Sequence, residues 1–383
     1  MATRHAPVAL ALQTVRNNDN LHLTPPASPI PDHLDQESCV SPKITYLALR
    51  PSRPQEFQQA LDLQRDDAGK PVEYGRGVWS VVYMARPSWT LPAAGLTPPP
   101  SPGPSSRVFA VKAPLRRDAH AVLQAEALIL TRINWTSGWE HYVVPFHGFI
   151  TTSSTIVMSA LPLQLSTYVE DRVAIARQNF STRTMFDPVL GLSQWLEVAR
   201  TLIAGLAWLH NEAHVIHGDI KPHNILLRPR PVQDGSDLTL AYDPLYTDFS
   251  SAHDLLPPTS PASDSPRTSL SALSPPFTAP ELLSVSVLQS PDLVATAPCD
   301  VFSLAATLLA AATGDLLLYP GTSSMQRLAM SRDGHQVLDY VQFGPNGSRV
   351  PRKGTIENIL KQAITKEPSK RILAREWLKL VES

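Results

Sequence analysis

The sequence predicts an α+β fold in which a small β-rich part is followed by a larger helical part. Short segments rich in Val, Tyr and Phe dominate up to about residue 160, and apolar residues recur at helical spacing beyond residue 190. Strands first and helices later are typical of folds that segregate the two kinds of element. Hydrophobic residues make up 43% of the 383 residues, which is enough for a sizeable core.

Four segments predict strands, because they are short, rich in β-branched residues and bounded by Pro, Gly or Ser. They are residues 78–85, 107–113, 142–150 and 154–160. One helix, roughly Asp118 to Ile133, interrupts them. We expect this β-rich part to span residues 45–160.

Four helices are predicted in the helical part, which we expect to span residues 161–383. They are residues 192–213, 299–314, 355–364 and 372–382. The second of them, CDVFSLAATLLAAATG, is apolar nearly all round and is therefore expected at the centre of the core.

Proline is over-represented, with 37 residues, roughly twice the usual share of about 5%. It is concentrated in residues 23–33, 96–106 and 256–277. These stretches lack the apolar periodicity needed for packing and are typical of disordered or extended chain. We therefore expect a disordered tail at residues 1–44 and two loop insertions, the first at about residues 87–106.

The charge and cysteine content exclude several classes of protein. A formal net charge of −1 gives no general attraction to nucleic acid or to an anionic membrane. No apolar run has the length of a membrane span, and no secretory signal is recognisable. The two cysteines, Cys39 and Cys299, are too far apart for metal-ligand spacing and fit a reducing compartment. We expect a cytoplasmic and/or nuclear protein with no nucleic-acid or membrane partner.

The segment EYGRGVWSVVY, residues 73–83, fits the front of a glycine-rich phosphate loop. Gly75 and Gly77 have no Cβ, so backbone amides there can approach phosphate oxygens, and Val82 follows. Ser80 stands where a third glycine is usual. The match alone is weak, because two glycines in a hairpin form an ordinary turn at least as often.

Lys112 lies in the otherwise apolar strand VFAVKA. It either extends its charged end to water from an edge strand or is held inward as a cation for phosphates. An inward lysine needs an anion, and Glu126 lies centrally in the predicted helix at 118–133. A Lys112–Glu126 pair is therefore expected if the lysine points inward.

The stretch HVIHGDIKPHNILL, residues 214–227, places Asp219, Lys221 and Asn224 in one loop. Downstream follow TDFSS at 247–251, FTAPELL at 277–283, CDVFSL at 299–304 and PSKRILA at 368–374. Together with the glycine loop, the lysine strand and the glutamate helix, these segments resemble the protein kinase family from about residue 70 to 382.

This resemblance implies a bilobal kinase fold and phosphoryl transfer from ATP to a protein substrate. Asp219 would accept the proton of the substrate hydroxyl or orient it, and Asn224 and Asp248 would hold Mg²⁺. Lys112 would grip the α and β phosphates, and Lys221 would neutralise the γ-phosphate during transfer. The alternative for Asp219 is an ordinary turn aspartate, which would leave Asn224 and the Asp-Phe pair unexplained.

The resemblance also implies three structural contacts. Asp300 would cap the backbone of the catalytic loop, and Glu281 would pair with Arg371. Ser274 would bridge the catalytic aspartate and lysine.

The same resemblance places the adenine ring between the two lobes. The residues around the ring would be Val82, Ala110, Leu226, the gatekeeper Met158, and Ser159 to Leu161 of the hinge. An ordinary buried methionine would fit position 158 equally well.

Small-molecule kinases of the aminoglycoside and choline type also carry an HGD-x-x-x-x-N loop. Lys221-Pro222 favours a serine/threonine protein kinase instead, because the small-molecule enzymes usually place His-Pro there. The Ala279-Pro280-Glu281 element, which those enzymes lack, favours the same conclusion. A small-molecule kinase and a weakly catalytic nucleotide-binding scaffold remain as alternatives.

Four residues depart from the family pattern. Gly218 replaces the arginine that meets an activation-segment phosphate, so a switch based on that ion pair is unavailable. Ser80, Ser250 and Leu273 replace glycines. None of these changes removes a group that would contact the metal ion or the phosphates of ATP, which favours an active enzyme.

The activation segment, Asp248 to Glu281, is crowded with Ser-Pro dipeptides. The serines and threonines that precede proline in the whole chain are Thr24, Ser28, Ser41, Thr97, Ser101, Ser260, Ser265, Ser274 and Ser290. They are candidate sites for upstream proline-directed kinases. The alternative is that Ser and Pro are simply the residues that disordered loops contain.

Overall fold

The computed structural model describes most of the chain after residue 50. The described residues are 51–88, 107–231, 240–255, 273–284 and 294–383. The expected tail, residues 89–106 of the first insertion and residues 256–272 lie outside them. Of the Ser-Pro and Thr-Pro sites, Ser274 lies within the described residues and the others lie outside.

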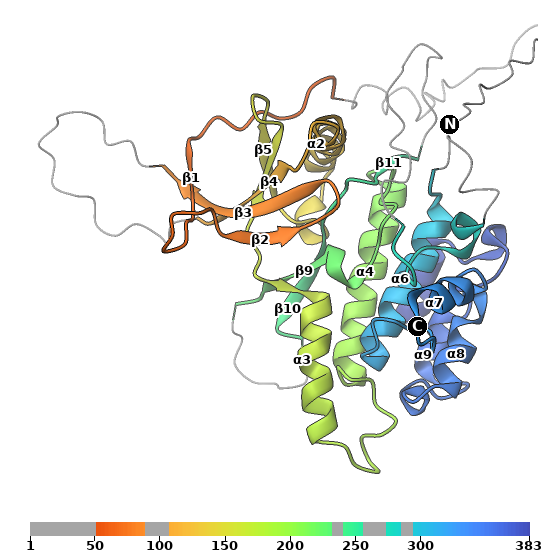
Figure 1. Ribbon diagram of the computed structural model, residues 1–383. Helices are drawn as coiled ribbons and strands as arrows, with labels where there is room; N and C mark the ends of the chain where they lie inside the picture. The colour runs from red at the N-terminus through yellow and green to blue at the C-terminus, as the bar shows by residue number, and fades with distance from the viewer. Residues whose placement is uncertain (1–50, 89–106, 232–239, 256–272, 285–293) are drawn as a thin grey trace, which may run out of the picture. The chain divides into compact units, whose positions relative to one another are not determined.

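Strands dominate the first part of the described chain, as predicted. Six of them form one antiparallel sheet in the order β1-β3-β4-β6-β5, with β2 pairing β3 (Figure 1). Their bounds are β1 Leu61–Leu63, β2 Glu73–Arg76, β3 Ser80–Pro87, β4 Phe109–Pro114, β5 Phe146–Ile150 and β6 Thr155–Ser159.

The register of this sheet places several of the predicted site residues on one face. Val82 lies opposite Lys112, and Ala110 lies opposite Met158. Because partners across a ladder and residues two apart share a face, all four side chains are on the same side of the sheet. The other side carries a separate apolar cluster of Ala85, Phe109, Val111 and Val157, covered by Phe57, Leu61, Leu63 and Ile150.

The segment before the glycine hairpin also belongs to the sheet, which the sequence prediction missed. The backbone N–H of Phe57 donates to the carbonyl of Phe149 at 3.0 Å, and the N–H of Phe149 donates to Gln55 at 2.8 Å. Residues 51–63 mix Gln, Arg and acidic residues with few apolar ones, so their sequence has no strand periodicity. Only pairing with β3 and β5 makes them strand-like.

β5 is shorter than predicted, because residues 142–144 pair with Tyr246 of another sheet. The N–H of Val144 donates to Tyr246 of β10 at 3.0 Å, and the N–H of Tyr246 donates to Tyr142 at 2.8 Å. This backbone pairing ties the β-rich part to the helical part.

Eight α-helices occur among the described residues. Their bounds are α2 Ala119–Trp135, α3 Leu165–Gln178, α4 Leu192–Asn211, α6 Ala297–Thr313, α7 Ser324–Ser331, α8 Val337–Phe343, α9 Thr355–Leu360 and α10 Ala374–Glu382. The helix predicted at 118–133 is α2, which packs against β4, β5 and β6. α9 ends four residues before its predicted end, because residues 361–363 form a turn.

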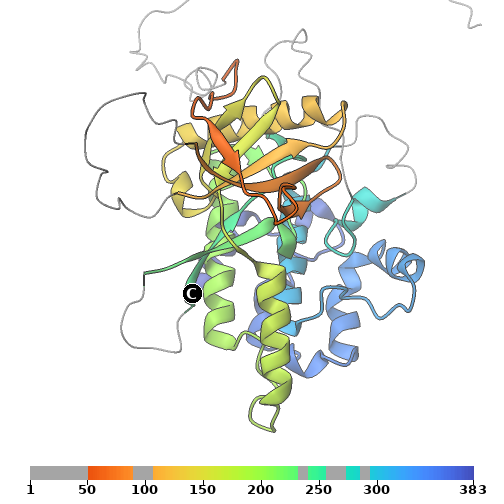
Figure 2. The ribbon, with the colours of Figure 1, turned by 60° about the vertical axis from the view of Figure 1, so that its left-hand side comes forward.

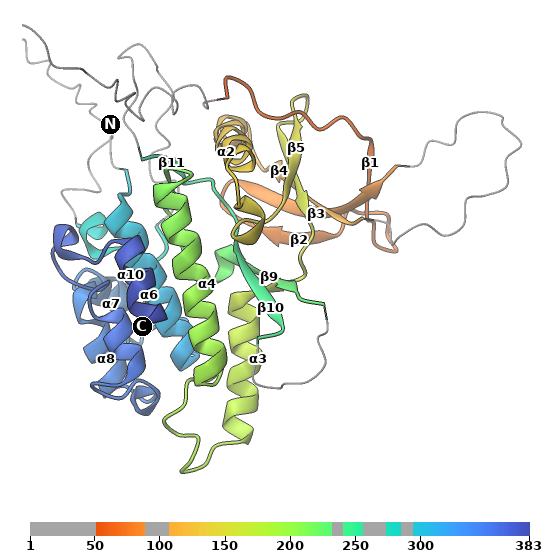
Figure 3. The same cartoon turned by 180° about the vertical axis from the view of Figure 1, so that it is seen from behind.

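α4 and α6 form the centre of the helical part. Every residue of α6 from Cys299 to Thr313 is buried, as its uniformly apolar sequence predicts. The indole N–H of the buried Trp195 in α4 donates to the carbonyl of Leu308 in α6 at 2.9 Å. Figure 3 shows α10 beside α4, which it contacts. No helix in the described part of the chain has the length and apolar character required to cross a membrane.

Two small sheets carry the loops between these parts. Their strands are β7 Leu163–Gln164, β8 Val215–Ile216, β9 Ile225–Pro229, β10 Tyr242–Tyr246 and β11 His253–Asp254. β9 pairs with β7 and β10, and β8 pairs with β11. Figure 2 shows β9 and β10 near α3 and α4, with which they make contacts. The loops that follow β8 and β10 contain the polar residues singled out in the sequence.

The predicted Glu281–Arg371 pair is present. The two guanidinium nitrogens of Arg371 each lie 2.7 Å from one carboxylate oxygen of Glu281. The Arg371 side chain is fully buried, whereas 26% of the Glu281 side chain is exposed. The pair joins the 3₁₀ turn at Pro280–Leu283 to the segment before α10.

Replacing Glu281 by Gln should destabilise the protein by about 3 kcal/mol, because it leaves the buried Arg371 charge without its anion. Urea unfolding measures this change through the midpoint. Arg375→Gln is the matched control, since Arg375 is exposed and lies 3.8 Å from Glu212, and it should change stability by less than about 0.5 kcal/mol. Equal losses in the two variants would contradict the expected role of burial.

Candidate active site

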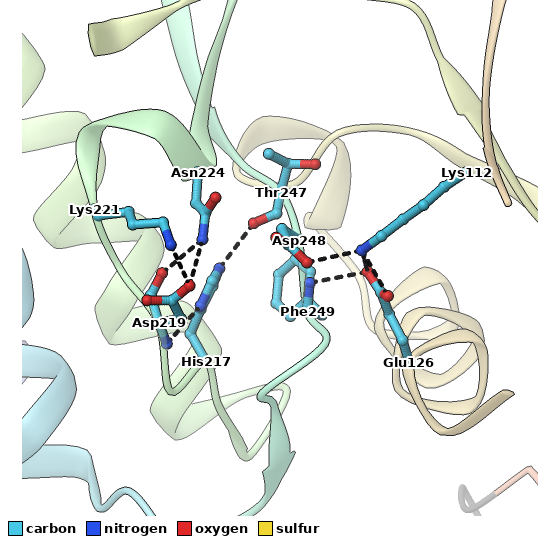
Figure 4. A network of polar contacts seen from close by, with 9 residues as sticks. All are labelled: Lys112, Glu126, His217, Asp219, Lys221, Asn224, Thr247, Asp248 and Phe249. Carbon is cyan, nitrogen blue, oxygen red and sulfur yellow. Dashed lines mark hydrogen bonds and ion pairs between the residues drawn. The ribbon is translucent and has the colours of Figure 1, made fainter. Parts of the chain in front are cut away.

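Four chain segments contribute the site. β4 supplies Lys112, α2 supplies Glu126, the loop after β8 supplies Asp219, and the loop after β10 supplies Asp248. Figure 4 shows these side chains converging from different elements, with Lys112 and Glu126 on one side and Asp219 on the other.

Lys112 points inward, and the predicted pair with Glu126 is present. Its ammonium nitrogen Nζ lies 2.7 Å from both carboxylate oxygens of Glu126 and 2.7 Å from Oδ1 of Asp248. Burial alone would lower the pKa of Lys112, but the charges of Asp248 and Glu126 outweigh burial and raise the pKa. Lys112 is therefore a fixed cation with two carboxylate partners.

Asp248 sits where the backbone takes an unusual conformation. Its φ is 61°, in the left-handed region that few non-glycine residues adopt. Burial acts to raise its pKa, but Lys112 and a hydrogen bond from the Ser250 side chain hold the pKa well below its usual range. The serine that replaces the family glycine is thus a donor to this carboxylate. About a third of the Asp248 side chain, 35%, remains exposed.

Glu126 also holds the residue after Asp248. The backbone N–H of Phe249 donates to Oε1 of Glu126 at 3.1 Å. The buried ring of Phe249 packs on the His217 ring at a centroid distance of 4.7 Å. The position of α2 and that of the Asp248 loop are therefore coupled through one carboxylate.

Asp300 supports the backbone of the catalytic loop, as expected from the sequence. Its carboxylate accepts from the N–H of His217 at 2.8 Å and from the N–H of Gly218 at 2.9 Å. His210 Nε2 lies 3.1 Å from the same carboxylate. Burial acts to raise the pKa of Asp300. The His210 hydrogen bond and the other donors outweigh burial, so the pKa lies below its usual range.

His217 joins the two loops of the site. Its Nε2 lies 3.0 Å from the carbonyl of Thr247, and its Nδ1 accepts from the N–H of Asp219 at 3.3 Å (Figure 4). This pattern assigns the proton of the neutral ring to Nε2, since a carbonyl can only accept.

Gly218 is required by the fold. Its φ is +80°, and a Cβ there would lie 2.6 Å from the carbonyl oxygen of Ser251. An arginine at this position would need the Ser251 backbone to move. The replacement of the family arginine by Gly218 therefore follows from the close approach of the Ser251 backbone.

Asp219 is surrounded by donors. Oδ2 accepts from Lys221 at 2.6 Å and from the Asn224 amide at 3.1 Å, and Lys221 also reaches the Ser274 hydroxyl at 2.8 Å. The expected bridge of Ser274 with the aspartate and lysine is thus present. Burial raises the pKa of Asp219, although Lys221 acts in the opposite direction.

Three of the residues expected around adenine lie together on one face of the sheet. Val82, Ala110 and Met158 share the Lys112 face of the sheet, and Leu226 on β9 is partly buried. The Ser159 side chain instead lies on the other face, because Ser159 pairs with Phe109 and its hydroxyl lies 2.9 Å from His147 Nε2. Ser159 can therefore offer adenine only its backbone. Leu161 is partly buried beyond the end of β6.

Gly75 and Gly77 lie in the β2–β3 hairpin, as expected. Gly75 is opposite Val82, and the N–H of Gly77 donates to the carbonyl of Ser80 at 2.8 Å. A Cβ at Gly75 would meet no atom within 4 Å. Packing in the protein therefore does not require glycine at position 75, and open space beside the backbone is what a bound phosphate would need.

A family model described as the protein kinase domain matches residues 104–380, well over half of the chain. The chain belongs to the protein kinase family. The β-rich part is the small lobe of the kinase domain, and the helical part is its large lobe. The match begins after the Gly75 hairpin, so the assignment of that hairpin still rests on its sequence and position. A comparison with curated proteins finds no match.

Sequence reasoning missed several contacts of the kinase domain. The Lys112–Asp248 ion pair, the Phe249–Glu126 hydrogen bond and the His217–Thr247 contact join residues that are 30 or more positions apart. No local pattern signals such contacts. The Ser250 contact with Asp248 is local, since the two residues are only two positions apart.

MgATP fits the residues present. Lys112 is fixed beside the Asp248 carboxylate, which the low pKa keeps ionised as a metal ligand must be. The amide nitrogen of Asn224 is held by Asp219, so the amide oxygen is the atom left for a cation (Figure 4). Both are oxygen donors, which Mg²⁺ prefers.

We expect MgATP at 100 times its dissociation constant to stabilise the kinase domain by about 2.7 kcal/mol. Thermal unfolding with and without Mg²⁺ measures the effect. Asp248→Asn should abolish its metal dependence, whereas Arg375→Gln, an exposed control, should retain it. Identical shifts with and without Mg²⁺ in the unmodified protein would contradict the assignment.

Proposed function

We propose that the protein is an active serine/threonine protein kinase that transfers the γ-phosphoryl group of ATP to serine or threonine hydroxyls of a protein substrate. The observation that carries this proposal is the contact of Lys221 with both Asp219 and Ser274. It joins the catalytic loop to the segment before Ala279-Pro280-Glu281 and leaves the aspartate beside a fixed cation.

The proposed reaction uses groups whose positions are fixed. The substrate hydroxyl oxygen forms the new bond to the γ-phosphorus while the bond to the leaving ADP oxygen breaks. Because Oδ2 of Asp219 accepts from Lys221 and Asn224, we assign Oδ1 to the substrate hydroxyl and its proton. Lys221 lies where it would neutralise charge on the transferred group.

Lys112 is the group that we assign to the α and β phosphates. In the protein alone its ammonium group contacts Asp248, and Glu126 keeps it in place. Asn224 and Asp248 would hold Mg²⁺, which neutralises phosphate charge when bound. Val82, Ala110, Met158 and Leu226, with the backbone of the hinge, would surround adenine.

One feature disfavours a small-molecule kinase. Lys221 contacts Ser274 and thereby supports the segment that leads to the Glu281–Arg371 pair. That segment is the element expected to hold a peptide. A catalytically weak scaffold is disfavoured because Lys112, Asp219, Asn224 and Asp248 are all present and engaged.

Asp219→Asn should lower turnover by roughly 10²–10⁴-fold, the size expected for loss of a general base or orienting group. Nucleotide affinity should change little, because Asp219 is assigned to the substrate hydroxyl rather than to the nucleotide. Phosphate incorporation from MgATP into a mixture of peptides measures turnover, and phosphoamino-acid analysis identifies the acceptor hydroxyl.

Equal incorporation by Asp219→Asn and the unmodified protein would mean that any activity comes from a contaminant. The scaffold alternative would then be preferred. Phosphotyrosine as the main product would remove the serine/threonine assignment while leaving the kinase assignment intact.

We further propose that turnover is largely independent of phosphorylation in the activation segment. Gly218 provides no cation for a phosphate, and the fold leaves no space for a side chain there. The Ser274 hydroxyl is already bonded to Lys221. Proline-directed kinases would therefore act at the other Ser-Pro sites, where phosphorylation would change the binding of partners or the degradation of the protein.

Phosphatase treatment should therefore change kcat by less than tenfold, about 1.4 kcal/mol on the barrier. The combined replacement of Ser260, Ser265, Thr268 and Ser269 by alanine should have the same small effect. These four residues lie outside the described part of the chain. A larger fall in either sample would mean that phosphorylation switches the enzyme.

A further inference from the structure

Arg132 is a buried cation near the end of α2 that the proposed reaction does not use. Only 6% of its side chain is exposed. Its guanidinium forms an ion pair with Asp254, and one of its nitrogens lies 3.4 Å from the carbonyl of His214. Its Nε has no hydrogen-bond partner among the described residues.

One of these contacts lies on strand β11, and the other is to the residue that immediately precedes strand β8. Asp254 is in β11 and pairs with Val215 of β8, and the N–H of Leu255 donates to His214 at 2.9 Å. β8 leads directly into the loop that carries Asp219, whereas β11 follows the loop that carries Asp248. One guanidinium therefore contacts the supports of both active-site loops.

Arg132 and Glu126 fasten α2 at two different places. They are six residues apart, which separates them by about 9 Å along the helix and about 120° around it. Glu126 contacts Lys112 and Phe249, while Arg132 contacts Asp254 of β11 and His214, the residue before β8. The helix also packs against β4, β5 and β6, and the two polar contacts add fixed points at two separate places on it.

Stability alone is a poor reason for this arrangement. A buried ion pair costs desolvation energy that its attraction often only balances, and an apolar residue of similar size is frequently as stable. The unpartnered Nε adds to that cost. A role in holding the geometry of the site accounts for a buried arginine better.

The neighbouring Gly218 supports this role. The position beside Asp219 can hold no cationic side chain, because the Ser251 carbonyl occupies the space of its Cβ. Instead, the Arg132 guanidinium of α2 contacts the activation segment. Its partner there is the carboxylate of Asp254 rather than a phosphorylated side chain.

We propose that Arg132 is a positioning residue that locks α2 to the supports of both catalytic loops and so keeps Glu126 in contact with Lys112 and Phe249. This inference rests on the proposed kinase function, and it identifies how the active arrangement is held without an activation-segment phosphate.

The test compares Arg132→Lys with Arg349→Lys in the full chain. Lysine keeps the charge but lacks the planar guanidinium whose separate nitrogens contact Asp254 and His214. Arg349 is a matched control, since it is also buried and donates to the carbonyl of Asp187 at 2.7 Å in the large lobe. The measurements are kcat, KM for ATP, Tm and amide hydrogen exchange of residues 119–135 and Phe249.

Arg132→Lys should lower kcat tenfold or more while KM for ATP changes less than threefold. Exchange in α2 and at Phe249 should become faster. Arg349→Lys should lower Tm by a similar amount and leave both kcat and this exchange unchanged. Asp254→Asn should reproduce the effect of Arg132→Lys, and combining the two should add little.

Two results would overturn the inference. One is a kcat and an exchange pattern for Arg132→Lys that equal those of the unmodified protein. The other is a loss of kcat that follows the loss of Tm equally in Arg132→Lys and Arg349→Lys. If the unmodified protein transfers no phosphate, the proposed function fails, and the exchange comparison alone still decides the role of Arg132.

Discussion

The arrangement of the site depends on a single buried ammonium group. Lys112 is held between Glu126 and Asp248, so a strand, a helix and a loop from distant parts of the chain meet at one charge. A buried lysine with one missing partner would leave an uncompensated charge, which is strongly unfavourable. The positions of β4, α2 and the loop after β10 are therefore coupled to one another.

A second constraint acts on the opposite side of the site, where the Asp300 carboxylate accepts backbone hydrogen bonds that secondary structure would otherwise satisfy. The loop from His217 to Asn224 has few ladder hydrogen bonds, and Asp300 satisfies two of its backbone N–H groups. Because Asp300 begins the most deeply buried helix, α6, the catalytic loop is fixed to the core of the large lobe. Rigid support of this kind is what positioning in phosphoryl transfer requires.

The two constraints meet at His217, which contacts both loops and packs on Phe249. Beside it, Gly218 has no Cβ, which allows the Ser251 backbone to approach closely. The close approach explains why the loop cannot carry the usual arginine. Order in the first part of the activation segment then comes from backbone pairing of β8 with β11 and from packing.

The sequence by itself determined the α+β class, the central position of α6, and the pairing of Lys112 with Glu126, because these follow from periodicity and from the need of a buried charge for a partner. It could not determine which residues before the glycine hairpin join the sheet, since their strand character comes only from pairing with β3 and β5. It also could not show which way the Ser159 side chain points, which the strand register decides by turning it to the face opposite Lys112. The Lys112–Asp248 and Arg132–Asp254 ion pairs were decided by tertiary structure alone, because they join residues more than 100 positions apart and no local pattern carries that information.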